Sequence, residues 1–440
     1  MTDTPNVPLP LDPREQPILE ILSVYRDQLT LLKQDRTTYV KSSDVMKLYE
    51  KVVDQVKLLN DIRADKPQAE NRLDRVLDAC FQLLSLFFMT IGKNNEAPAA
   101  YALTSTIKRL LDHLTESQLY SEKDLEHISA TIESLREIMR SAKATYSPKL
   151  ITLLSNRLDL CHISCKNLQN NLDRLGQELP SIHEKLISIL RSISLANTKS
   201  KFSTSEVQGL QAQLKEIGSQ RVDGKFLTAS GEAPAGNEEI NELLRKCLLW
   251  SEIVFERKGE IPAGFKDTYQ ILIDIRNKLE KLSLTQAWSL RETDLYDFQR
   301  QLDKIDESRV DGNFLDVEGK PAELYVQRTL LYLIRRSYAY IYLLMVSSEP
   351  VSEALLPIYN QLQTLKRCLI EVKNSGGVSS PRELYPYSMK LNSIDNMRKD
   401  GKFMVGPDIP EGQGSLNELL AECFELNYEL RVAAESEAEE

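Results

Sequence analysis

One six-residue phrase occurs three times in this chain, at residues 221–226, 309–314 and 398–403. The copies read RVDGKF, RVDGNF and RKDGKF, and they start 88 and then 89 residues apart. Self-similarity at a nearly fixed distance is typical of repeat proteins, in which each unit buries its apolar face against its neighbours. The chain of 440 residues is therefore predicted to consist largely of tandem units.

The sequence after each phrase continues the repeat. A loop with Gly and Pro comes first, and the segments NELLRKC (241–247) and NELLAEC (417–423) then share Asn, Glu, two Leu and Cys at the same spacing. The middle copy, TLLYLIR (329–335), keeps only the paired leucines. We expect a helix to begin after the loop in every copy.

The sequence before each phrase predicts two further helices. Apolar residues recur three and four positions apart, and the second segment opens with Ser or Thr followed by an acidic residue, which is a helix N-terminal signal. Weaker copies lie within 42–84 and 121–161, and the candidate cap acids recur at Asp44, Asp124, Glu206, Asp294 and Glu383. We predict an all-α fold of about five tandem three-helix repeats, arranged as an elongated helical array or as stacked bundles.

The expected domain organisation follows from the strength of these repeats. Residues 1–16 are Pro-rich and are predicted to be disordered, and residues 17–178 form an N-terminal helical region with two weak repeats. Residues 179–432 form a C-terminal helical region with three clear repeats, and residues 433–440 form an acidic tail. Runs of like charge at a terminus are typical of solvated tails.

Composition and charge restrict the class of partner. The formal net charge is −10, and no basic run is dense enough for a nucleic-acid interface, so we expect no nucleic-acid partner. The apolar runs 80–92 and 330–346 are shorter than the ~20 residues that span a bilayer, so we expect no membrane insertion. Six cysteines without a secretory signal indicate reduced thiols. The cytosol is the expected compartment, and the nucleus is the alternative.

The sequence contains no recognisable catalytic or cofactor-binding motif. It lacks GxGxxG, GxxxxGK[ST] and HExxH, and none of the four histidines lies in a nucleophilic or zinc-binding context. CHISC (161–165) places two cysteines one helical turn apart, but a structural zinc site needs four ligands. We therefore expect a protein that is not an enzyme, with no catalytic residues, no cofactor and no metal.

The repeated phrase is interpreted first as a structural stop signal. Gly takes the left-handed conformation at the residue after a helix, the preceding Asp makes an Asx turn, Phe returns to the core and Arg pairs with Asp or with the last carbonyls. Alternatively, the Arg/Asp loops line one edge and hold a partner peptide or a phosphate. The candidate residues are Arg221, Asp223, Gly224, Phe226, Arg309, Asp311, Gly312, Phe314, Arg398, Asp400, Gly401 and Phe403.

Two further features have a structural and a functional interpretation. Ser147 and Ser380 each precede a proline at a predicted helix start, where helix capping is favoured and phosphorylation is the alternative. The segment 332–345 carries four tyrosines around Arg335 and Arg336. A buried face with surface-reaching hydroxyl groups and arginines is favoured there over base stacking.

The three RxDGxF phrases, the loops with Gly and Pro and the NELLxxC helices resemble a family of fungal proteins described only as a domain of unknown function. The resemblance is strongest from about 180 to 432, and it implies a soluble, intracellular helical protein without established catalytic residues. Together these observations favour a non-enzymatic scaffold or adaptor that binds other proteins. The alternative is a small-ligand or phosphate-binding protein, or an enzyme, that uses the Arg/Asp loops or a pocket between helices.

Overall fold

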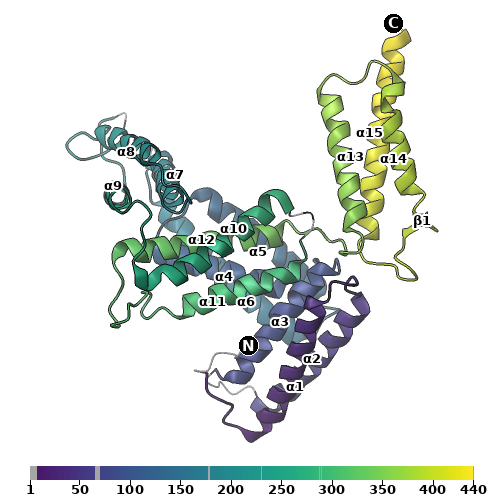
Figure 1. Cartoon of the computed structure of the whole chain (residues 1–440), viewed down its shortest axis with the longest axis horizontal. Coiled ribbons are helices and arrows are strands. Elements are labelled where there is room, and N and C mark those ends of the chain that lie inside the picture. The colour runs from purple at the N-terminus through teal and green to yellow at the C-terminus, as the bar shows by residue number, and fades with distance from the viewer. Residues whose placement is uncertain are drawn as a thin grey trace. The chain divides into compact units, whose positions relative to one another are not determined.

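Helices make up most of the computed structural model, which describes residues 7–64, 70–176, 179–228, 230–286, 288 and 290–439. Fifteen α-helices occur in this described part of the chain, and its only strands are β1 (Arg398–Lys399) and β2 (Lys402–Phe403), which pair antiparallel (Figure 1). The predicted all-α fold is confirmed. No helix in these ranges is long and apolar enough to cross a membrane.

The helices belong to two compact units. Unit 1 combines the chain up to Ala102, the segment Gln286–Tyr296 and the chain from Ser347 onward. Its helices are α1 (Gln16–Gln34), α2 (Ser42–Arg63), α3 (Arg72–Thr90), α13 (Leu356–Asn374), α14 (Tyr385–Asp395) and α15 (Gln413–Glu439), with 3-10 turns η1 (Pro13–Glu15), η2 (Ala97–Ala99), η6 (Glu292–Asp294) and η7 (Pro381–Leu384).

Unit 2 contains Leu103–Thr285 and Asp297–Val346. Its helices are α4 (Ala100–Ser117), α5 (Glu122–Ala142), α6 (Pro148–Asp173), α7 (Leu179–Asn197), α8 (Thr204–Ser219), α9 (Asn237–Arg257), α10 (Lys266–Lys281), α11 (Leu295–Glu307) and α12 (Leu324–Val346), with the 3-10 turn η3 (Ala263–Phe265) and the short π-helix η4 (Leu282–Gln286). Grouping by packing differs from grouping by sequence similarity, and the predicted boundary at residues 178/179 stays a prediction.

Helix packing follows the predicted order of helices within a repeat. α1 packs on α3, α7 on α9, α10 on α12 and α13 on α15, so the first and third helices of a triplet are neighbours (Figure 1). In the second triplet α5 packs on α6 instead. The number of five repeats stays a prediction, because the sequence copies in the first two triplets are weak.

A buried thiol recurs at the contact between first and third helices. In three triplets a cysteine of the third helix donates its S–H to a leucine carbonyl of the first helix, with Sγ–O distances of 3.5–3.7 Å. The pairs are Cys80 with Leu22, Cys247 with Leu186, and Cys423 with Leu362. The Cys of NELLxxC is therefore a packing residue that sits where two helix backbones approach closely.

The expected helix caps form in some copies and not in others. Ser121 and Asp124 make a reciprocal capping box, and Ser203 accepts a hydrogen bond from the Glu206 N–H. The expectation of a side-chain cap near Asp44 was wrong, because α2 already begins at Ser42 and its N-cap residue, Lys41, makes no side-chain cap.

Part of the predicted disordered segment 1–16 is held in place. Residues 1–6 lie outside the described residues, but η1 includes Glu15, which is fully buried. The Glu15 carboxylate accepts hydrogen bonds from Arg63 Nε at 2.8 Å and Asn71 Nδ2 at 3.1 Å. These contacts attach η1 to α2 and to the start of α3. At the other terminus α15 extends to Glu439, through most of the predicted acidic tail, and Glu440 lies outside the described residues.

A buried ion pair joins distant segments within unit 1. Arg291 donates two hydrogen bonds to Glu353, with Nε–Oε2 at 2.6 Å and Nη2–Oε1 at 2.9 Å, and both side chains are about nine-tenths buried. Arg291 also donates to the carbonyls of Asp35 and Thr38, and the Val40 N–H donates to Glu353. The α1–α2 loop, the segment before η6 and the chain before α13 thus meet at one charged cluster.

Next to this cluster, the backbone of residues 351–352 packs closely against two glycines. Gly92 has φ +84°, and a Cβ there would lie 2.6 Å from Ser352 N and 2.9 Å from Val351 C. Gly412 has φ +101°, and a Cβ there would lie 2.8 Å from Val351 Cα. Both positions therefore need glycine for their left-handed conformation and for close backbone approach.

We expect Gly92→Ala to destabilise unit 1 by about 1–3 kcal/mol, because it adds backbone strain and a steric overlap with Ser352. Thermal unfolding followed by circular dichroism measures the change as a lower melting temperature. Gly414→Ala is the matched control, because Gly414 starts α15 in open space and Ala favours the helix. Equal melting temperatures for Gly92→Ala and the control would contradict the close approach.

Candidate functional site

The three copies of the repeated phrase form the same tight hairpin. In each copy both the Asp and the Gly have positive φ, and the residues on either side pair as an antiparallel bridge. The φ values are 49° and 77° for Asp223 and Gly224, 48° and 79° for Asp311 and Gly312, and 50° and 75° for Asp400 and Gly401. Two left-handed central residues define the hairpin turn that Asn-Gly and Asp-Gly sequences favour.

This geometry corrects the expected position of the glycines. The preceding helices α8, α11 and α14 end at Ser219, Glu307 and Asp395, before the phrase begins. The glycines are therefore the second central residues of a hairpin turn and not the residues that directly follow a helix. Asp tolerates the left-handed conformation better than most residues, which explains its place before Gly.

The phenylalanine of each phrase is anchored through its backbone as well as its ring. Phe226, Phe314 and Phe403 are buried, and each backbone N–H and C=O pairs with one side-chain carboxamide at the start of the next helix. The carboxamides belong to Asn237, Gln327 and Gln413, which follow the Phe by 11, 13 and 10 residues. The sequence analysis did not identify these three residues. The Asn or Gln near the start of each following helix was the sequence feature that could have indicated them.

The arginines of the repeated phrases form hydrogen bonds or ion pairs with side chains of nearby helices. Arg221 Nη1 lies 3.2 Å from Asn241 Oδ1, and Arg398 Nη1 lies 3.2 Å from Asn417 Oδ1. These two asparagines are the Asn of the NELLxxC segments, and each also donates to the carbonyl of the hairpin glycine. The first and the third copy therefore each contain the same kind of Arg–Asn–Gly hydrogen-bond network.

The middle copy, which lacks that asparagine, uses carboxylates instead. Arg309 pairs with Asp306 at 2.8 Å and with Glu116 at 2.7 Å, and its Nη1 also donates to the Gly312 carbonyl. In the described residues the partner of each arginine is therefore not the Asp of its own phrase. Most guanidinium donors in these loops have partners inside the fold, and ligand binding by the Arg/Asp loops stays a prediction.

Polar side chains in unit 2 connect α4 and α11 beside the ion pairs of Arg309. His113 Nε2 lies 3.1 Å from Asp306 Oδ2, and both residues are buried. Burial acts to raise the pKa of Asp306, but the hydrogen bond from His113 and the nearby arginine charges outweigh burial and lower it. The ionised Asp306 therefore links α4, through His113, with α11 and the hairpin that follows α11, through Arg309.

The tyrosines of α12 also take part in the interior. Tyr338 donates to Asp303 at 2.6 Å, Tyr340 to Glu280 at 2.8 Å, and Tyr342 lies 2.7 Å from Thr131 Oγ1. Each of these hydroxyl groups pairs with a polar group of a neighbouring helix in a partly buried position, so none points freely into solvent. All three rings are buried, which leaves them no open face for base stacking.

The predicted phosphorylation sites lie at helix starts. Ser147 is exposed and precedes α6 without making a side-chain cap, whereas Ser380 Oγ accepts from the Arg382 N–H at the start of η7. Capping therefore occurs at Ser380, and modification of either serine stays a prediction.

The cysteines of CHISC pack between helices. Cys161 and Cys165 are buried, and Cys165 Sγ donates to the Leu125 carbonyl of α5. Burial raises the pKa of the Cys161 thiol to about 11. Across the described ranges, no group of three His, Cys, Asp or Glu side chains is arranged to hold a metal ion.

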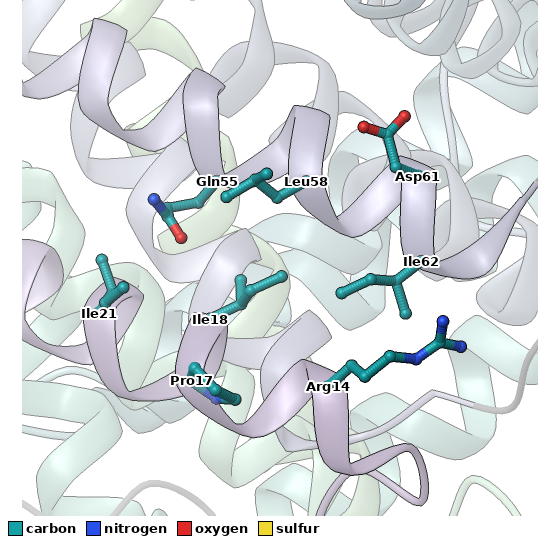
Figure 2. A pocket seen from close by; sticks show the side chains of 8 residues that line it. All are labelled: Arg14, Pro17, Ile18, Ile21, Gln55, Leu58, Asp61 and Ile62. Atoms are coloured by element: carbon teal, nitrogen blue, oxygen red, sulfur yellow. The ribbon is translucent and has the colours of Figure 1, made fainter.

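An apolar groove of about 450 Å³ lies between α1 and α2 in unit 1 (Figure 2). Leu58, Ile62 and Gln55 of α2 lie across from Pro17, Ile18 and Ile21 of α1, and Arg14 and Asp61 lie at its rim (Figure 2). Leu58 is 52% exposed, although it is a large aliphatic residue. Val24 and Leu31 of α1, which do not line the groove, are exposed as well, at 53% and 66%.

The comparisons with known proteins place this helical architecture in one family. A family model described as "Protein of unknown function (DUF2408)" matches residues 172–292 and 349–440. The CUB1 family protein C30C2.08 of Schizosaccharomyces pombe is 40% identical over 441 residues, which cover 98% of this chain and 95% of that protein. This chain belongs to the CUB1 family of fungal proteins.

A second relative has a more specific name. The Cu(2+) suppressing and bleomycin sensitive protein 1 of Saccharomyces cerevisiae is 38% identical over 505 residues, with coverage of 97% of this chain and 91% of that protein. No solved structure matches the chain. The resemblance noted in the repeated motifs is confirmed.

We expect Gln413→Ala to destabilise the third hairpin by about 1–3 kcal/mol, because it leaves the Phe403 N–H and C=O without their carboxamide partner. Hydrogen exchange should show loss of protection at the Phe403 amide, together with a lower melting temperature. Gln361→Ala on α13 is the control, because Gln361 bonds only one helix carbonyl there. Unchanged protection at Phe403 would contradict the anchor.

Thiol labelling tests the burial of the cysteines. Cys368 is exposed, whereas burial raises the pKa of Cys247 to about 12 and of Cys423 to about 11. Because only the thiolate reacts, we expect one rapid modification per chain at pH 8, at Cys368, and slow reaction of the other five. Cys368→Ser should abolish the rapid phase, and a second rapid thiol would contradict the packing.

Proposed function

We propose that this protein is a non-enzymatic scaffold that binds other proteins, and that the α1–α2 groove holds an amphipathic helix of a partner. The observation that carries the proposal is the apolar lining of the groove, which includes Ile18, Ile21, Leu58 and Ile62, with Ile21 37% and Leu58 52% exposed. Contiguous exposed apolar surface favours protein association. An isolated exposed leucine, in contrast, is common on protein surfaces and does not indicate a binding site.

The dimensions of this groove suit a short helix. Gln55 and Ile62, at the two ends of its lining on α2, are seven residues apart, which corresponds to roughly 10 Å along that helix. A partner helix that lies along the groove would present apolar residues at three- and four-residue spacing over about two turns. Arg14 and Asp61 at the rim supply opposite charges that can fix the orientation of such a helix.

The name of the budding yeast relative connects that protein with Cu²⁺ and bleomycin. For this chain we propose an indirect part in such responses, through a protein partner and not through a bound copper ion. The support is local: Cys161 and Cys165 are buried, and Cys165 is hydrogen-bonded to a helix carbonyl. We place this binding in the cytosol, with the nucleus as the alternative compartment.

The test compares partner recovery by the tagged full-length chain, its Ile21→Glu/Leu58→Glu variant and the control Leu160→Glu. Leu160 is an exposed leucine of α6, with 59% exposure, in the other unit. We expect the unmodified chain and the control to retain a stoichiometric partner and the double variant to lose at least nine-tenths of it. Circular dichroism establishes that all three chains have the same helix content.

Two results would count against the proposal. Recovery of no stoichiometric partner by the unmodified chain argues against a scaffold. Equal recovery by the double variant and the control argues that the α1–α2 groove is not the binding surface.

A further inference from the structure

Helix α12 in unit 2 carries two arginines, Arg328 and Arg335, on one face. They are seven residues apart, which is close to two helical turns and corresponds to roughly 10 Å along the axis. Both residues are partly buried. Arg328 lies against α9, where its Cζ is 5.6 Å from the centre of the Trp250 ring.

Both guanidinium groups have an unused buried donor. Arg328 Nη1 and Arg335 Nε are enclosed and have no hydrogen-bond partner. Within the described part of the chain neither arginine forms an ion pair with a carboxylate. The Trp250 ring attracts the Arg328 cation, but it does not neutralise the charge.

The carboxylates nearest to Arg335 are already paired. Glu116 and Asp306 act on Arg335 through their charge, but both form ion pairs with Arg309 at 2.7 and 2.8 Å. Asp306 also accepts from His113. Arg309 and Arg328 add positive charge near Arg335, so attraction and repulsion offset each other there.

Burial without a partner disfavours the charged form of an arginine. Removal from water lowers the pKa of Arg335 to about 10, and it lowers the pKa of Arg328 as well. Buried cations in proteins are usually paired, as Arg291 is with Glu353 in unit 1. The two α12 arginines depart from that rule in a chain whose net charge is −10.

We propose that Arg328 and Arg335 form a binding site for a small anion that carries at least two phosphate groups. A guanidinium group presents paired N–H donors that match the oxygens of a phosphate, and such charge-assisted pairs are strong. Two guanidinium groups carried by residues two helical turns apart on one face can each bind a phosphate of the same anion. This site is distinct from the Arg/Asp hairpins, whose arginines are engaged by Asn, Asp or Glu side chains.

The neighbouring residue offers a matched control. Arg336 is exposed, donates to the Tyr340 hydroxyl at 2.9 Å and lies over that ring, with 4.4 Å between Cζ and the ring centre. Replacing Arg336 removes the same charge from the same helix without altering the two unpaired groups.

The test titrates the full chain with inorganic tripolyphosphate by calorimetry at constant ionic strength. We expect saturable one-to-one binding, and at least tenfold weaker binding of inorganic phosphate. Arg328→Gln/Arg335→Gln should weaken tripolyphosphate binding at least tenfold, whereas Arg336→Gln should stay within twofold of the unmodified chain. Arg328→Lys/Arg335→Lys, which keeps the charge and loses the forks, should fall between these two.

The melting temperature of the ligand-free variants distinguishes a binding role of the two arginines from a structural role. Because the two charges lack partners, the Gln double variant should melt at the same temperature as the unmodified chain or higher, and tripolyphosphate should stabilise only chains that keep both arginines. A large fall in melting temperature for the Gln variant would overturn the proposal. Absence of tripolyphosphate binding, or equal binding by the Gln variant, would also overturn it.

Discussion

A desolvated ion pair between Arg291 and Glu353 joins segments of unit 1 that lie far apart in the sequence. The two residues are 62 positions apart, and their cluster includes backbone groups of the α1–α2 loop, more than 250 positions away from Arg291. A guanidinium group with two carboxylate bonds and two carbonyl partners is nearly saturated, which makes its burial tolerable. Loss of either partner would leave a buried charge, so the cluster strongly favours one arrangement of these segments.

The repeated hairpins also provide partners for buried polar groups, in this case backbone groups that follow the second helix of each repeat. A chain that leaves one helix and enters another must satisfy exposed backbone groups, and a buried Phe makes that requirement stricter. In each copy one side-chain carboxamide forms hydrogen bonds with both the N–H and the C=O of the Phe, as a neighbouring strand would. Asp-Gly supplies the turn, Phe supplies the burial, and Asn or Gln supplies the missing pair of hydrogen bonds.

Sequence patterns predicted the helical class and the order of helices, because helix periodicity, caps and Leu pairs are local signals. They did not predict Asn237, Gln327 and Gln413, because the distance from Phe to amide varies from 10 to 13 residues and defeats a fixed-spacing comparison. The Arg291–Glu353 pair has no local signal at all. The α1–α2 groove was equally hidden, since Ile18 and Ile21 are alike in sequence but only Ile18 is fully covered. The meaning of Asp-Gly was misjudged because hairpin turns and helix ends both use left-handed glycine.

Unit 1 is assembled from both ends of the polypeptide, with most of unit 2 encoded between them. During synthesis α1, α2 and α3 therefore emerge before the segments that complete their unit. At roughly 5–20 residues per second, translation of the roughly 240 intervening residues takes about 12–50 seconds. Throughout that interval Thr90 and Gly92 lack the segment 351–353, whose backbone packs against them in the finished unit. Completion of unit 1 therefore has to follow the synthesis of the segment that carries Glu353, because the buried partner of Arg291 does not exist before then.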